Sequence, residues 1–143
     1  MLISVRPNLD YESSYSELVA GVDEAGRAPL AGPVTAAAVI LDFKNIPDGI
    51  NDSKKLNAKK RMQLAAEIKE SAIAYSICEA NLEEIDRLNI LHASMLAMQR
   101  CVEQLNPQPV HALIDGNRLP ESLPCPATPI IKGDAKSLSI AAA

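Results

Sequence analysis

The sequence predicts a mixed α/β domain with five strands and flanking helices. Two observations predict this class. Five short apolar runs have the length and branched side chains typical of strands. Between them, apolar residues recur at helical spacing behind residues that cap helices well. The 143 residues suit one domain, and 48% hydrophobic with only 3% aromatic content predicts an aliphatic core.

The N-terminal third is expected to supply two strands. Residues 1–17 carry little pattern and are expected to form a loose start. Residues 18–22 are predicted to form a buried strand that ends at Asp23 and Glu24, and residues 34–41 a second strand. The stretch 25–33 contains Gly and Pro, so a turn is expected there that makes the two strands antiparallel neighbours.

The middle of the chain predicts helix, strand, helix and helix. Asn57 is expected to cap a helix over residues 58–70, and alternating apolar residues predict a strand over 72–78. Asn81 begins a near capping box, and Asn89 can cap a second, longer helix. Apolar side chains form one side of the first helix (Met62, Leu64, Ala65 and Ile68) and one alternating face of the strand (Ile73, Tyr75 and Ile77). The buried stripe expected in the last helix consists of Leu91, Met95, Met98, Val102 and Leu105.

The C-terminal part predicts two more strands, over residues 110–114 and 128–131. From Ser137 the sequence becomes helical again, and residues 140–143 carry no helix stop signal. We therefore expect a poorly patterned N-terminal segment, residues 1–17, and one domain over residues 18–143 that is incomplete at its C-terminus.

Composition argues against several classes of protein. The three cysteines are widely spaced without a C-x-x-C pair, and His92 and His111 lie far apart, so neither a disulfide framework nor a zinc site is predicted. We find no signal-peptide pattern and no apolar run of the roughly 20 residues that span a bilayer, so we expect a cytoplasmic protein with no membrane association.

The charge distribution leaves nucleic-acid binding open. The net charge of −4 disfavours non-specific binding to a polyanion. Residues 51–61, however, carry Lys54, Lys55 and three further basic side chains against Asp52 alone. This cluster is either a contact for phosphates or a solvated, lysine-rich helix start.

Acidic residues follow three of the apolar runs. Asp23 and Glu24 follow the first, Asp115 follows residues 110–114, and Asp134 comes shortly after residues 128–131. Strand ends are where α/β sheets place functional groups, and converging carboxylates need a cation such as Mg²⁺ or Mn²⁺ between them. The alternatives are that Asp115 belongs to a turn, that Asp134 is a helix N-cap, and that Asp23 and Glu24 are solvated.

Residues 21–34, GVDEAGRAPLAGPV, closely resemble the first signature of the type 2 ribonucleases H, the bacterial ribonuclease HII branch. Further segments match in the family's order, and together they cover essentially all of residues 18–143. They are NDSKKL at 51–56, IDRLNILHA at 85–93, IDGNR at 114–118, KGD at 132–134 and SIAAA at 139–143.

The resemblance implies a ribonuclease H-like mixed five-stranded sheet with flanking helices, in which residues 18–143 form the catalytic domain. It implies cleavage of the RNA strand of RNA–DNA hybrids, and cutting on the 5′ side of ribonucleotides embedded in duplex DNA, by a monomer that uses Mn²⁺ or Mg²⁺. The catalytic metal ligands that it implies are Asp23, Glu24, Asp115 and Asp134.

The resemblance also implies substrate contacts. Gly26, Arg27 and Ala28 match the segment that touches the ribose 2′-hydroxyl, the group that separates RNA from DNA. Lys54, Lys55 and Arg118 are candidates for phosphate contacts, or else exposed surface charges.

Two departures from the family pattern matter. Ala28 stands where the family has Gly, so its methyl group is expected to weaken the grip on the 2′-hydroxyl. The family's C-terminal helical region, with a tyrosine that recognises the ribonucleotide, is missing, so weak or no activity is expected from this chain alone. The competing hypotheses are a catalytically silent nucleic-acid-binding fragment and an unrelated small-molecule α/β module.

Overall fold

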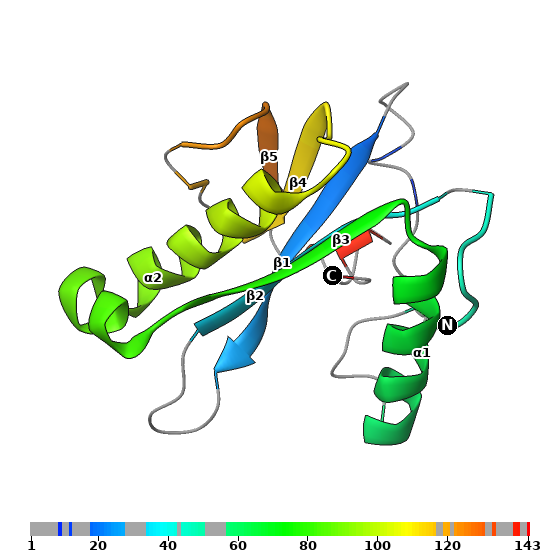
Figure 1. The fold of residues 1–143 in the computed structure, drawn as a ribbon, viewed down its shortest axis with the longest axis horizontal. Helices are drawn as coiled ribbons and strands as arrows, with labels where there is room; N and C mark the ends of the chain where they lie inside the picture. The colour runs from blue at the N-terminus through cyan, green and yellow to red at the C-terminus, as the bar shows by residue number, and fades with distance from the viewer. Residues whose placement is uncertain are drawn as a thin grey trace, which may run out of the picture.

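The computed structural model describes residues 9, 12, 18–27, 34–42, 44–50, 57–116, 119–120, 122–130, 133, 139–140 and 143. Figure 1 shows a twisted sheet with one long helix laid across it. In chain order the elements are β1 (Val19–Arg27), β2 (Val34–Ile40), α1 (Ala58–Ser71), β3 (Ala74–Ala80), α2 (Leu82–Gln104), β4 (His111–Asp115) and β5 (Ala127–Ile130).

The five strands form one mixed sheet in the order β3-β2-β1-β4-β5. β1 pairs antiparallel with β2, which pairs antiparallel with β3. On its other edge β1 runs parallel to β4, and β4 runs parallel to β5. The predicted element order and the antiparallel pairing of the first two strands are confirmed, and β1 lies at the centre of the sheet.

β1 does not end where the sequence pattern predicted. It continues through Ala25 to Arg27, so the predicted end of the strand at Asp23 and Glu24 is wrong. Glu24 pairs with Ala36 and Gly26 with Thr35, so two steps along β1 match one step along β2. This register shift is a β-bulge, which bends the strand without ending it.

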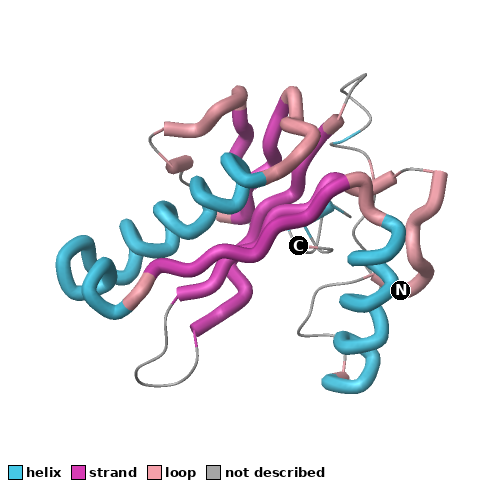
Figure 2. The backbone as a smooth tube through the Cα atoms, viewed as in Figure 1, coloured by secondary structure: helices cyan, strands magenta, loops and turns pink. Residues whose placement is uncertain are grey.

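One face of the sheet packs against α2 through small side chains. Figure 2 shows α2 running along this face. Ala36 and Ala38 of β2 and Ala93 and Ala97 of α2 are all fully buried, so helix and sheet approach closely. Cys101 is held in the same layer, where its Sγ donates a hydrogen bond of 3.0 Å to the Ala36 carbonyl.

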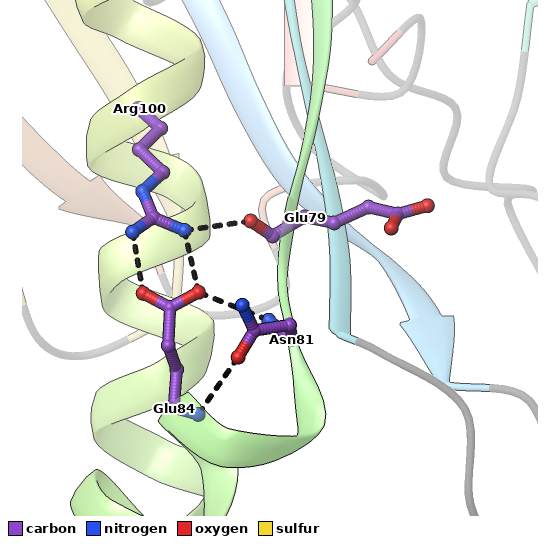
Figure 3. Close-up of polar contacts among 4 residues, drawn as sticks. All are labelled: Glu79, Asn81, Glu84 and Arg100. Atoms are coloured by element: carbon purple, nitrogen blue, oxygen red, sulfur yellow. Dashed lines mark hydrogen bonds and ion pairs between the residues drawn. The ribbon is translucent and has the colours of Figure 1, made fainter.

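α2 consists of two helices joined at Asn89, as the capping residues predicted. Asn89 has a φ of 64° and its Oδ1 accepts hydrogen bonds from the amides of Leu91 and His92. Asn81 and Glu84 form the predicted capping box at the first helix. Figure 3 shows Arg100 forming a two-pronged ion pair with Glu84 and donating to the Glu79 carbonyl. These contacts tie both helices to the end of β3.

The opposite face of the sheet carries two smaller clusters of buried residues. Leu64 and Ile68 of α1 pack on Val39 and Leu41 with Ile50. The second cluster, which lies closer to the acidic strand ends, consists of Val19, Leu113, Ile130 and Ile140.

Several apolar side chains that follow the predicted spacings are exposed. Met62 is 76% exposed and Leu91 44%, although both fit the helical stripes. On β3 the alternation is as predicted, but the apolar face, Tyr75 and Ile77 included, is the exposed one. The spacing of apolar residues along a helix or strand does not show which of its faces the fold buries. Within the part of the chain that the structure describes, no helix is long and apolar enough to cross a membrane.

Candidate active site

The parallel pairing of β1 and β4 brings two of the predicted acids side by side. Val22 pairs with Ile114, so Asp23 and Asp115 are the next residues on neighbouring strands that run in the same direction. Neighbouring strands lie about 4.8 Å apart. Val22 and Ile114 point into the α2 core. Because side chains alternate along a strand, both aspartates are directed to the opposite face.

The backbone after β5 orients one of these carboxylates. The Gly133 amide donates a hydrogen bond of 2.7 Å to Oδ1 of Asp115. A Cβ at Gly133 would lie 3.2 Å from that oxygen and 2.5 Å from Cδ1 of Ile140. Glycine therefore lets the chain approach Asp115 closely, and the bond leaves Oδ2 as a second oxygen donor.

The other predicted residues are described only in part. The backbone of Glu24, Gly26 and Arg27 belongs to β1, directly after Asp23 and around the bulge. The side chains of Glu24 and Arg27 lie outside the described part of the structure. Five further predicted residues lie wholly outside the described part of the structure: Ala28, Lys54, Lys55, Arg118 and Asp134.

The carboxylate oxygens of the described acids suit a hard divalent cation. Asp23 and Asp115 are half-buried, and both offer carboxylate oxygens, which Mg²⁺ and Mn²⁺ prefer. Among the residues that the structure describes, no three His, Cys, Asp or Glu side chains form a complete metal site. Two of the four predicted acids are thus brought together on one face of the sheet.

One contact near Asp23 and Asp115 was not predicted from the sequence. Ser139 and Ile140 are helical and lie directly on β1, where a Cβ on Gly21 would be 2.0 Å from the Ser139 carbonyl carbon. Glu12, from the segment expected to be loose, is fully buried there and accepts a 2.9 Å hydrogen bond from the Ser139 amide. Glu12 and Ser139 are 127 positions apart in the sequence, so no local sequence pattern could predict their contact.

The described cysteine and histidine side chains offer no competing site. Burial raises the pKa of the Cys101 thiol to about 12 and also raises the pKa of Cys125, so neither is an activated nucleophile. Burial lowers the pKa of His111, which lies at the start of β4, the opposite end of that strand from Asp115. An open cavity of about 590 Å³ beside α1 is lined by Asp48, Lys60 and Glu67 among others, and neither Asp23 nor Asp115 is among its described lining residues.

Comparison with known proteins identifies the family. The family model described as Ribonuclease HII matches residues 20–143, which is most of the chain. The chain belongs to the ribonuclease HII family.

Curated ribonucleases HII resemble the chain closely over part of their length. The one from Marinomonas sp. is 57% identical over 129 residues, which are 90% of this chain and 65% of that protein. The one from Magnetococcus marinus is 62% identical over 125 residues, 86% of this chain and 58% of that protein. The chain therefore spans less than two thirds of the length of these two ribonucleases HII.

Solved structures confirm the ribonuclease H-like fold. The ribonuclease H2 from Pyrococcus horikoshii superposes with a TM-score of 0.72 at 25% identity, covering 87% of this chain and 67% of that one. Bst-RNase HIII in complex with Mn²⁺ gives a TM-score of 0.69 at 21% identity, covering 89% of this chain and 49% of that one. The second likeness is one of fold alone.

Proposed function

We propose that this chain carries the carboxylate site of a divalent-metal endonuclease that hydrolyses the RNA strand of RNA–DNA hybrids. The same site is proposed to cut on the 5′ side of ribonucleotides embedded in duplex DNA. The observation that carries the proposal is the pairing of Asp23 and Asp115 at neighbouring strand ends, in a chain of the ribonuclease HII family. We propose residues 18–143 as the catalytic domain.

Four carboxylates are proposed to hold Mn²⁺ or Mg²⁺: Asp23, Glu24, Asp115 and Asp134. When bound, such ions supply the positive charge that activates a water and stabilises the leaving oxygen of a phosphodiester. Two features of the chain support the set. The Gly133 amide fixes Oδ1 of Asp115, and Asp134 is the next residue in the chain. The bulge after Glu24 can redirect neighbouring side chains of β1.

The substrate contacts remain part of the same proposal. Gly26 and Arg27 extend β1 beyond Asp23, which is a suitable position for a backbone that meets the scissile nucleotide. Ala28 follows, and Lys54, Lys55 and Arg118 are proposed to contact phosphates. A 2′-hydroxyl recognised at the end of β1 would confine cleavage to ribonucleotides.

Asp115→Asn tests the proposal. Losing one ligand charge should cost about 2.7 kcal/mol of transition-state stabilisation, which is about 100-fold in rate. The measurement is cleavage of a labelled duplex that holds one ribonucleotide, in Mn²⁺, beside Mn²⁺ binding by calorimetry. Mn²⁺ is a suitable first probe because Bst-RNase HIII, which shares the fold, was solved in complex with it.

Asp48→Asn, at an exposed loop aspartate, is the matched control and should behave as the unmodified chain. Equal Mn²⁺ binding by the Asp115→Asn variant and the unmodified chain would show the proposed site to be wrong. Binding of Mn²⁺ and duplex without cleavage would favour the silent nucleic-acid-binding alternative.

A further inference from the structure

Glu12 is a buried carboxylate in an unusual position. Its side chain is fully buried, although the residues around it in sequence carry no apolar pattern. Its Oε2 accepts a hydrogen bond of 2.9 Å from the Ser139 amide, and the Ser139 backbone lies against Gly21 of β1. Oε1 and the Ser139 hydroxyl are buried without a hydrogen-bond partner among the described residues. Burying polar groups without partners costs free energy, so this contact has to be offset by packing elsewhere.

A short chain of contacts leads from Glu12 to the candidate site. Ser139 is followed by Ile140, whose side chain is fully buried in the cluster with Leu113. Cδ1 of Ile140 fills the space next to Gly133, 2.5 Å from where a Cβ would be. Gly133 in turn donates its amide to Oδ1 of Asp115. Each step is a direct contact between described atoms.

A second route runs through β1. The Ser139 backbone lies against Gly21, in the space that any side chain there would need. Asp23 lies two residues further along β1, on the same face of the sheet as Gly21. Residues 139–140 therefore contact Gly133, whose amide orients Asp115, and Gly21, which lies two residues before Asp23.

We propose that Glu12 is a positioning residue for the carboxylate site. By accepting the Ser139 amide, it holds residues 139–140 against β1, and Ile140 then keeps Gly133 in place to orient Asp115. This inference rests on the proposed function, because it concerns the site that would bind the metal. It gives the N-terminal segment a role in metal binding that its sequence does not suggest.

Mn²⁺ affinity of the folded chain tests the proposal, measured by calorimetry well below the melting temperature. Glu12→Ala should weaken binding about tenfold, the lower end of the roughly 10–100-fold loss that follows when partners of metal ligands are removed. Glu12→Gln keeps an acceptor oxygen and should stay within about threefold of the unmodified chain. Glu70→Ala, at an exposed glutamate of α1, is the control and should change nothing.

A merely structural role would lower the melting temperature of the Glu12→Ala variant but leave its Mn²⁺ affinity unchanged, and that result would overturn the proposal. A Glu12→Gln variant as weak as Glu12→Ala would overturn it too, because the hydrogen bond would then not be the cause. If Glu12→Ala fails to fold, Glu12→Asp replaces it. That variant keeps a carboxylate on a side chain one carbon shorter, and the same outcomes decide.

Asp115→Asn, measured in parallel, separates the two proposals. If it binds Mn²⁺ like the unmodified chain, the carboxylate site itself is wrong and Glu12 has nothing to position. If it loses binding while Glu12→Ala retains full affinity, only the positioning role is wrong.

Discussion

Burial alters the protonation of His111, at the start of β4. Its Nε2 lies 2.8 Å from Oγ1 of Thr128 on the neighbouring strand, and burial lowers its pKa. The unfolded chain then binds the proton more tightly than the folded chain does. Stability from this residue is therefore complete above the unfolded pKa of about 6.5 and is lost as the pH falls below it.

We accordingly expect His111→Gln to reduce the drop in melting temperature between about pH 7.5 and about pH 5.5. Gln keeps polar atoms for Thr128 but cannot titrate in this range. The comparison variant is His92→Gln, at an exposed position of α2, which should show the full drop. Identical drops in both variants would contradict the assignment.

Part of the candidate site could be predicted from the sequence. Asp23 and Asp115 could be found because each directly follows buried apolar residues of a strand, and strand ends are marked locally in the sequence. Glu12 could not be found, since its partner lies 127 residues away. The sequence marks Gly133 only as part of the KGD segment at 132–134. Its role depends on how closely a backbone approaches Asp115, which spacing does not encode.

Among the helices and strands, the bend at Asn89 makes a specific prediction. Asn89→Ala removes an acceptor from two amides and keeps a Cβ at a φ of 64°, where Asn89 already has one. The lost cap should destabilise the fold by about 1–2 kcal/mol. Chemical denaturation measures the change.

Asn89→Gly is the matched variant, because it also loses the cap but tolerates the positive φ. It should cost less than about 1 kcal/mol. Equal losses in the two variants would show that backbone strain does not matter at this bend.

Elements with strong local signals were predicted well, and those decided by distant contacts were not. Asn81 and Asn89 marked both helix starts in α2, because a cap acts within three residues. The extension of β1 to Arg27 was missed, since it depends on pairing with Val34 across the sheet. The exposure of Ile77 was missed for the same kind of reason, because coverage of a face is decided by the tertiary fold.

For the molecule as a whole, the net charge of the chain and the charge of the proposed substrate have the same sign and repel each other. The chain has 18 acidic and 14 basic side chains and a net charge of −4. An RNA–DNA hybrid is a polyanion, so long-range electrostatics disfavour the encounter. Divalent ions held by Asp23 and Asp115 would reverse the sign of the field where the two surfaces meet, because a bound cation is often the largest local charge in a site.

We therefore expect hybrid binding to depend on the divalent cation. The dissociation constant for a short hybrid should be at least about tenfold higher in EDTA than in Mn²⁺, a difference of about 1.4 kcal/mol. Gel shifts at fixed ionic strength measure it, with Asp115→Asn as the comparison variant, whose binding should respond much less to Mn²⁺. Equally tight binding in EDTA would contradict this expectation and assign the affinity to the basic residues of 51–61 instead. Such binding would then weaken steeply as monovalent salt is raised, because phosphate contacts made by Lys and Arg release counterions.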